Sequence, residues 1–564
     1  MKRKSPSPHA GRGGSLLPRA ARTSKAMLSV LLTASWALFQ QPAAAEVKVP
    51  QILGDHMVMQ RQMPVPVWGT DTPGQKITVK FRDQTKETTA AADGKWMVKL
   101  DPLQAGGPEK MVIVGSSQLI LNDILVGEVW VGSGQSNMAN SVSIGLENGK
   151  RFNAPDTKLA SLAAATYPQI RMYTSKGAGH DQWQEAAPAN IPQFSGLLFS
   201  FGVPLQRELN VPVGLVVGAV GGTPSCMWLS KEAYQTDAAC TDSVKKFATT
   251  YPFDELQKKY EADKAAYDQA LAASQGTENK PRLVQPRPPG KAGEPLPGWK
   301  VGDHFESRIR PLIPYAMRGV LWDQGESGTG LVGVAPYTLM GALIHSWRKD
   351  WGQGDFPFLY VQKPSGGGLA WDANDPVTSQ ADKFAPVVGK GPRPNDVSGF
   401  SRETFLKIMK YPGASMVASS DLGGGTHPTN KSGYGERAVR AAMGAVYGKK
   451  IEIYGPLYES HAIEGDKVRI KFTHTGDGLA FRNGDKPQGF AIAGDDQKFV
   501  WADAAIDGTT VVVSSPAVPK PAAVRYAWSA AIPWANLFSK GGLPAQAFRT
   551  DAWPVPSDLL RAGK

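Results

Sequence analysis

The chain has 564 residues, of which 41% are hydrophobic and 20% are charged, and its formal net charge is +12. This composition is typical of a folded globular protein and excludes a disordered or collagen-like chain, while the length allows roughly two to four domains. With only two cysteines, Cys226 and Cys240, a four-cysteine zinc site and a disulfide-framework fold are also excluded.

Residues 1–45 have the features of a secretory signal peptide. They hold seven basic and no acidic residues, an apolar run Met27–Phe39, and a small-residue end at Ala43–Ala45. The alternative is a membrane anchor, but the run is shorter than the ~20 residues that span a bilayer. We expect cleavage after Ala45, a periplasmic or extracellular location and no membrane span in the mature chain. Removing seven positive charges from +12 leaves +5, and export would permit a Cys226–Cys240 disulfide.

Residues 46–122 are predicted to form a β-sandwich-like module. Lys76–Phe81 and Lys95–Leu100 alternate polar and apolar residues, as half-buried strands do, and the pairs Pro73-Gly74 and Asp93-Gly94 suit tight turns.

Residues 123–447 have a different pattern, in which near-continuous apolar runs are separated by long connections. Such runs indicate buried parallel strands of an α/β sheet. The runs are Ile124–Val131, Val213–Val220, Arg318–Asp323, Phe358–Gln362 and Ser415–Ser419. The expected helices are Leu197–Leu209, Tyr337–Lys349 and Lys431–Tyr447, the last with Asn430 as its cap.

Two further segments complete the chain. Residues 241–300 are expected to form an excursion over the α/β domain, with a solvated helix at Phe253–Ala273 followed by proline-rich sequence. Residues 448–564 return to short β-type runs and predict a second small β-rich module.

Candidate functional residues follow the predicted parallel strands, because active sites of open parallel sheets form at the carboxyl ends of the strands. A tight Gly/Ser loop holds Ser136 after the first strand, and a small-residue turn holds Gly222 after the second. Gln324 and Gln362 lie at the ends of the next two strands, and His427 follows the last. A serine, a turn, two amides and a histidine are thus expected at one edge.

Ser136 and His427 suit nucleophilic catalysis. A serine in a tight loop can have backbone N–H groups around it that bind an oxyanion. The alternatives are an ordinary loop serine and a capping histidine. Met138 stands where the Gly-x-Ser-x-Gly elbow of α/β-hydrolases requires glycine. The histidines lack metal-ligand spacing, and neither a nucleotide-binding nor a nucleic-acid-binding motif is present, so we expect no metal and no cofactor.

Several motifs make the sequence similar to a known family. They are Val126–Val131, Ser133-Gly134-Gln135-Ser136-Asn137-Met138, Gly221-Gly222-Thr223-Pro224, Gln324-Gly325-Glu326-Ser327 and His427-Pro428 with Lys431. Together with His56–Arg61 and Pro64–Gly69, they resemble the sialate O-acetylesterase family of SGNH (GDSL-like) hydrolases, over nearly the whole mature chain. The resemblance implies a three-layer SGNH-hydrolase domain with a parallel sheet, flanked by N- and C-terminal β-rich modules.

The resemblance also implies a reaction that removes acetyl groups from sugar hydroxyls. By analogy, Ser136 attacks the acetyl carbonyl and His427 accepts its proton. The backbone N–H groups of Ser136 and Gly222 and the side-chain amide of Gln324 would hold the oxyanion, and water would complete the reaction without a cofactor.

The chain departs from the family pattern at two places. Gly424 and Gly425 stand where the family often has an aspartate that orients the histidine, which leaves Asp421, a backbone carbonyl, or Glu326 or another acid for that role. Asp323 and Gly328 replace an aromatic residue and an asparagine, which affects the expected sugar contacts. The candidate substrate-binding residues are Gln135, Asn137, Glu326, Gln362 and Arg402.

The sequence therefore predicts an exported, metal-independent serine carbohydrate esterase whose partner is an acetylated sugar or glycan. One rival is an acetylxylan or other polysaccharide acetylesterase. The other is a non-catalytic carbohydrate-binding protein on a degenerate SGNH scaffold.

Overall fold

A computed structural model describes residues 46–176, 181–275, 283–387 and 391–554. These residues belong to one compact unit, Ala45–Lys564. The predicted signal segment, residues 1–45, lies outside the described residues. Within the described ranges, no helix combines the length and the apolar character needed to cross a bilayer.

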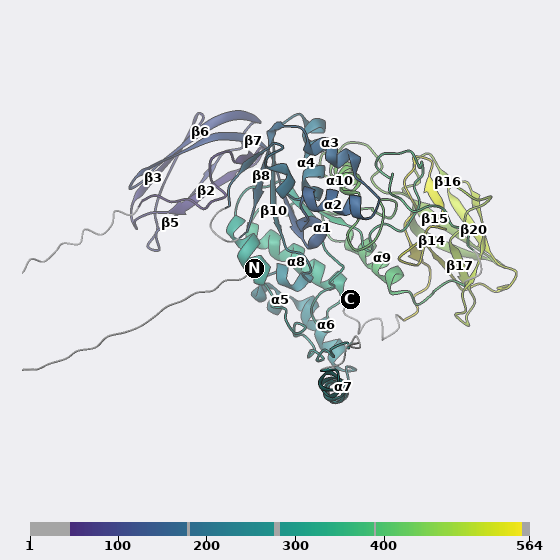
Figure 1. Ribbon diagram of the computed structural model, residues 1–564. Coiled ribbons are helices and arrows are strands. Elements are labelled where there is room, and N and C mark those ends of the chain that lie inside the picture. The colour runs from purple at the N-terminus through teal and green to yellow at the C-terminus, as the bar shows by residue number, and fades with distance from the viewer. Residues whose placement is uncertain (1–45, 177–180, 276–282, 388–390, 555–564) are drawn as a thin grey trace, which may run out of the picture. The chain divides into compact units, whose positions relative to one another are not determined.

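A parallel sheet occupies the middle of the chain (Figure 1). Its strand order is β13-β12-β11-β7-β10-β8-β9, with parallel pairing from β13 to β8 and an antiparallel β9 at the edge. The strands are β7 (Gln118–Gly134), β8 (Tyr167–Thr174), β9 (Gln184–Ala186), β10 (Val213–Ala219), β11 (Gly319–Asp323), β12 (Phe358–Val361) and β13 (Ala414–Val417). The five predicted parallel strands are confirmed as β7, β10, β11, β12 and β13, whereas β8 and β9 were not predicted.

Helices cover both faces of this sheet. Consecutive residues of a strand point to opposite faces, so each buried strand contributes to two hydrophobic cores. Trp130 and Leu321 pack into a core with residues of α4 and α10, whereas Val320 and Trp322 pack into a core with residues of α8 and α9. The helices are α1 (Ser136–Ala139), α2 (Val142–Arg151), α3 (Thr157–Ala163), α4 (Gly196–Leu209), α8 (Pro336–Trp351), α9 (Val397–Ile408) and α10 (Lys431–Ala445). The predicted cap of α10 is confirmed, since the Asn430 side chain accepts from the N–H of Gly433 at 2.8 Å.

The N-terminal β region joins the sheet through β7. The first part of β7 pairs with β6 and β1, and its last residues pair with β10 and β11, so the expected boundary after residue 122 falls inside one strand. The strands of this region are β1 (Val58–Gln60), β2 (Val65–Thr70), β3 (Lys76–Phe81), β4 (Gln84–Thr89), β5 (Lys95–Leu100) and β6 (Gly106–Val114).

The C-terminal region is β-rich, as predicted, and has its own hydrophobic core. Two four-stranded sheets have the orders β14-β15-β20-β19 and β18-β17-β21-β23, and β16 pairs with β22. The strands are β14 (Leu457–Glu464), β15 (Lys467–Thr473), β16 (Leu479–Phe481), β17 (Phe490–Ala493), β18 (Val500–Trp501), β19 (Asp503–Asp507), β20 (Thr510–Ser514), β21 (Ala523–Tyr526), β22 (Leu537–Ser539) and β23 (Phe548–Arg549).

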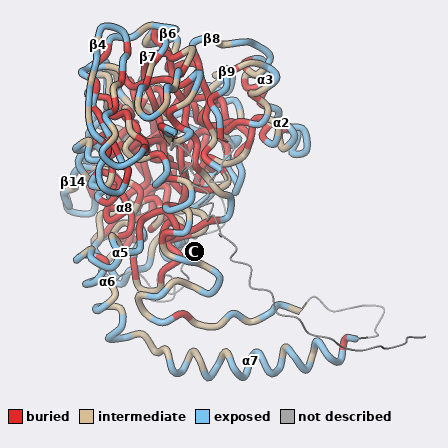
Figure 2. Tube along the Cα trace, turned by 90° about the vertical axis from the view of Figure 1, so that its left-hand side faces the viewer, coloured by how far each residue is buried: buried red, intermediate tan, exposed pale blue. Residues whose placement is uncertain are grey.

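The expected excursion contains the solvated helix that the sequence predicts. After α5 (Lys231–Thr236) and α6 (Ala238–Ala248), α7 spans Phe253–Ala273 and buries none of its residues. Figure 2 shows that this helix is largely exposed. Ion pairs between residues four positions apart, such as Lys259 with Asp263 at 2.9 Å, stabilise an exposed helix of this kind.

Candidate active site

The structure brings Ser136 and His427 into contact. Ser136 opens α1 directly after β7, and His427 lies in the loop between β13 and α10. The His427 Nε2 and Ser136 Oγ atoms are 2.9 Å apart, across 291 residues of sequence. Ser136 is half-buried and His427 is exposed, so a substrate can reach both. This is the contact by which a histidine activates a serine hydroxyl.

A glycine fixes the loop that presents Ser136. Gly134 has a φ of +126°, and a Cβ there would lie 2.1 Å from the carbonyl oxygen of Asp323. The adjacent N–H of Gln135 donates to that same oxygen at 2.9 Å. The first turn after β7 thus packs directly on the end of β11, which only glycine allows.

Two backbone N–H groups beside Ser136 are available to a ligand. A Cβ at Gly221 would lie 3.5 Å from the Cβ of Ser136, so the loop after β10 runs alongside the serine. Gly222 has a φ of +73° with open space around its Cα. Within the described part of the chain, neither the N–H of Ser136 nor that of Gly222 has an acceptor. Paired donors of this kind can hold an oxyanion.

Gln324, the third predicted oxyanion donor, makes other contacts in the structure. Its amide nitrogen donates to the carbonyl oxygens of Gly328 at 2.9 Å and Thr223 at 3.4 Å, and its oxygen accepts from the Ser225 hydroxyl. The side chain is 3% exposed. Gln324 therefore ties the Gly222 loop to the loop after β11, and its role as an oxyanion donor stays a prediction.

A buried polar network underlies the serine and histidine loops. The Asn137 amide donates to Glu326 at 2.8 Å and to the carbonyl of Thr426, next to His427, at 2.9 Å, while its oxygen accepts from Lys431 at 2.7 Å. Lys363 in turn lies 2.7 Å from Glu326. Asn137 and Glu326, predicted as substrate contacts, thus link the two catalytic loops to each other.

Lys363 and Lys431 were not among the predicted site residues. Lys363 follows Gln362 at the end of β12, and its ammonium lies 2.6 Å from the Asp323 carboxylate as well as near Glu326. The sequence signal that could have identified Lys363 as a site residue is its position at the carboxyl end of a buried strand. Two lysines and two carboxylates balance the charge of this buried cluster, which offsets the cost of burying each one.

The network sets the protonation of the site. Burial and the charge of Lys431 lower the pKa of His427 below its ordinary 6.5, with the Glu326 carboxylate opposing them. Burial lowers the pKa of Lys431 to about 8. Burial acts to raise the pKa of Glu326, but the Lys363 charge outweighs it and holds the pKa below its ordinary value. At neutral pH the imidazole is consequently uncharged and able to accept a proton.

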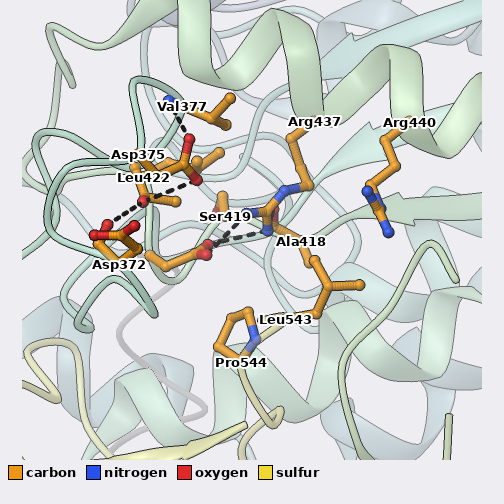
Figure 3. A network of polar contacts seen from close by, with 12 residues as sticks. Asp372, Asp375, Val377, Ala418, Ser419, Leu422, Arg437, Arg440, Leu543 and Pro544 are labelled. Carbon is orange, nitrogen blue, oxygen red and sulfur yellow. Dashed lines mark hydrogen bonds and ion pairs between the residues drawn. The ribbon is translucent and has the colours of Figure 1, made fainter. Parts of the chain in front are cut away.

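Asp421, one of the acids considered for orienting His427, is paired elsewhere. Both of its carboxylate oxygens accept from Arg437 on α10, at 3.0 and 2.8 Å, and Arg437 also donates to the carbonyl of Ala418 at 3.1 Å. Figure 3 shows the Arg437 guanidinium directed at the loop of Ala418 and Ser419. Asp421 is fully buried and is not among the contacts of His427 within the described residues. This ion pair anchors α10 to the start of the histidine loop.

Three other predicted substrate contacts lie inside the protein. Gln362 is fully buried and bonds Gln546 at 2.7 Å. Arg402 is 1% exposed and donates to the carbonyls of Gly366, Ser529 and Ala530. Gln135 is 2% exposed, and its side-chain oxygen accepts from the N–H of Ser327 at 3.2 Å. Each joins elements of the fold around the site.

The two cysteines are separate free thiols. Cys226 and Cys240 are buried and unpaired, so the permitted disulfide is absent from this structure. Burial raises the pKa of each thiol to about 12, which keeps both protonated. Over the described ranges, no three His, Cys, Asp or Glu side chains are grouped as metal ligands.

Comparisons with known proteins agree with the resemblance in the sequence. No family model matches the chain. The chain is 25% identical to sialate O-acetylesterase of Pongo abelii over 463 residues and 25% identical to that of Homo sapiens over 465 residues, with 75% of each chain covered in both cases. The predicted resemblance to the sialate O-acetylesterases is confirmed.

A solved structure is similar over most of the chain. It is the crystal structure of a carbohydrate acetylesterase from Xanthomonas citri, which is 28% identical with a TM-score of 0.67. The match covers 90% of this chain and 100% of that one. The flanking β-rich regions are therefore included in the similarity together with the parallel sheet.

Proposed function

We propose that this chain is an exported serine esterase that removes O-acetyl groups from sugars, with sialate O-acetylesterase as the specific activity. The observation that carries the proposal is the 2.9 Å contact between His427 Nε2 and Ser136 Oγ, next to two backbone N–H groups without acceptors among the described residues. The parallel sheet with helices on both faces supports a three-layer SGNH-hydrolase domain. The curated relatives support the ester-hydrolysing activity.

The proposed reaction has two halves. In the first, His427 accepts the proton of the Ser136 hydroxyl as its oxygen attacks the acetyl carbonyl, and the N–H groups of Ser136 and Gly222 stabilise the resulting oxyanion. Collapse breaks the bond to the sugar oxygen, which takes the proton from His427. In the second half, water attacks the acetyl-enzyme with His427 again as base, the bond to Ser136 Oγ breaks as that oxygen takes the proton back from His427, and acetate leaves. The residues suffice for each step without a cofactor.

Glu326 is the carboxylate best suited to support His427. Its Oε2 atom is buried and has no hydrogen-bond partner among the described residues, whereas Asp421 is bonded to Arg437 through both oxygens. Glu326 is linked to the backbone next to His427 through Asn137, and its charge favours the imidazolium that forms during attack. We infer that Glu326 is a positioning residue that acts through His427.

A second candidate function is deacetylation of a neutral polysaccharide such as acetylxylan. It is favoured by Asp323 and Gly328, which replace family residues close to the site, and by the similarity to a carbohydrate acetylesterase. The ordered contact between Ser136 and His427 argues against a non-catalytic sugar-binding protein, because such a protein has no need for it.

Export is proposed from the sequence alone. The basic segment, the apolar run and the Ala43–Ala45 end together form a signal-peptide pattern. Expression with the native leader, followed by N-terminal sequencing of the mature chain, tests this. A mature N-terminus at Glu46 is expected, and retention of residues 1–45 on a membrane-bound chain would contradict it.

Acetate release from O-acetylated sialic acid and from acetylated xylan tests the activity and separates the two substrates. The purified chain should release acetate from at least one of them, and Ser136→Ala should reduce kcat by about 10³-fold or more. Ser379→Ala, at an exposed serine, is the matched control and should retain activity. A Ser136→Ala rate equal to wild type would refute the proposed nucleophile.

A further inference from the structure

A cavity with the character of a sugar-binding site lies where Pro386, Val387 and Gly391–Pro394 meet the C-terminal β region. Its volume is about 340 Å³, within the range of roughly 300–1,000 Å³ typical of small-molecule sites. The walls include three half-buried aromatic side chains, Phe499, Trp501 and Trp534, and two polar ones, Arg525 and Ser529. Aromatic faces with a few polar groups are the usual lining of a ligand site.

Two of the aromatic side chains in the cavity lining contact each other. The rings of Trp501 and Trp534 have centroids 5.1 Å apart and planes inclined at 62°. The two rings therefore pack edge to face on each other and form one angled aromatic wall. Gly489 keeps the floor open, since a Cβ there would lie 3.0 Å from the Trp534 ring.

The charges around the cavity favour an uncharged ligand. Arg525 lies 4.6 Å above the Phe499 ring and is paired with the Asp551 carboxylate at 2.8 and 2.9 Å, so its charge is neutralised. The pair is buried, with exposures of 5% and 2%. Ser529 donates to the Asp396 carboxylate at 2.9 Å, and Asp396 lies in one backbone turn with Arg393, so an acidic and a basic residue are close in sequence on this side of the cavity. Held by Asp551 and by the carbonyl of Pro394, this guanidinium adds little net charge to the cavity.

One wall of the cavity is connected to the loops of the active site. Within the segment 529–534, the N–H of Ile532 donates to Gly367 at 2.6 Å, and Arg402 bonds the carbonyls of Ser529 and Gly366. The N–H of Gly366 then donates to Ser419 at 3.0 Å, in the segment that leads to His427. A glycan held in the cavity would therefore be bound by the loop system that supports the catalytic histidine.

We propose that this cavity is an accessory site for an uncharged glycan chain, separate from the catalytic pair. The aromatic lining by Phe499, Trp501 and Trp534, in one cavity with an arginine that Asp551 neutralises, carries the proposal. It would hold a polymeric substrate on the enzyme while its acetyl groups are presented to Ser136.

Binding of unacetylated oligosaccharides tests the proposal independently of the esterase activity. Calorimetric titration of the full chain with xylohexaose and with cellohexaose should show saturable binding of at least one of them. Trp534→Leu, which keeps apolar volume but removes the aromatic face, should weaken binding at least tenfold. Trp501→Leu, at the other ring of this pair, should do the same, so the test does not depend on one variant folding.

Trp371→Leu is the matched control, because Trp371 is a half-buried tryptophan in a different cavity. It should bind the hexasaccharides like wild type, with circular dichroism confirming the fold of every variant. Absence of saturable binding at 10 mM ligand, equal binding by folded Trp534→Leu or Trp501→Leu, or preferential binding of the anionic sialyllactose would each overturn the proposal. None of these outcomes depends on whether Ser136 is a nucleophile.

Discussion

Replacing Asp421 with asparagine should destabilise the protein and leave its chemistry nearly intact. Asp421 is 0% exposed and Arg437 is 5% exposed, and two charge-assisted hydrogen bonds of 3.0 and 2.8 Å join them. Asp421→Asn leaves the Arg437 charge buried with neutral acceptors only. Removing one partner of a buried pair costs about 3–5 kcal/mol, and the retained amide oxygen places this variant near the lower figure. For roughly 520 residues unfolding together, about 3 kcal/mol corresponds to a Tm lower by roughly 3 °C.

Thermal unfolding and steady-state hydrolysis of 4-nitrophenyl acetate, measured on the same preparations, test this reasoning. The kcat of Asp421→Asn should stay within about threefold of wild type at a temperature where the protein is folded. Asp466→Asn, in the exposed turn between β14 and β15, is the control and should change neither quantity. Adding Arg437→Met to Asp421→Asn should recover part of the lost stability. A kcat reduced 100-fold with an unchanged Tm would refute the reasoning and give Asp421 the orienting role.

Two further predictions concern the residues around the serine. Glu326→Gln removes the charge that opposes the lowering of the His427 pKa. Since neutral imidazole is the active form, kcat/KM of the wild type should rise with pH around a midpoint below 6.5. In the variant, this midpoint should be lower and kcat should be reduced at least tenfold. An unshifted pH profile would contradict the proposed role of Glu326. Gly134→Ala should reduce both Tm and kcat far more than Gly222→Ala does. The reason is that a Cβ at residue 134 would lie 2.1 Å from a backbone oxygen, whereas a Cβ at residue 222 has open space. Equal losses in the two variants would show that the packing at Gly134 is not required.

The elements that could be predicted are those whose signal is local. Near-continuous apolar runs mark the buried strands β7 and β10 to β13, and the side chain of Asn430 marks the start of α10. Strand β8 was missed because its first residues, Tyr167, Pro168 and Gln169, are not buried and the charged Arg171 interrupts the apolar residues that follow. The edge strand β9 has only three residues, too few for a sequence pattern. The expectation that strand ends meet at one edge was sufficient to select Ser136 and His427 together.

Side-chain partners across the fold could not be predicted in the same way. Asp421 was considered for His427 because it is near in sequence, but Arg437, 16 residues further along the chain on α10, offers it two donors. Gln362 directly follows β12 and Arg402 lies on α9, and both were predicted as substrate contacts, yet they bond carbonyl and amide groups of the C-terminal β region. Which partner a buried polar side chain binds depends on tertiary packing, and a local sequence pattern does not predict it.

The most direct test of the account is covalent labelling of the nucleophile. The purified protein is treated with a fluorophosphonate, which reacts with activated serines, and the adduct is located by peptide mass spectrometry. The account predicts a single adduct on Ser136 that is absent from Ser136→Ala and forms much more slowly in His427→Ala. An adduct on another serine such as Ser133, or labelling of Ser136 that does not depend on His427, would contradict it.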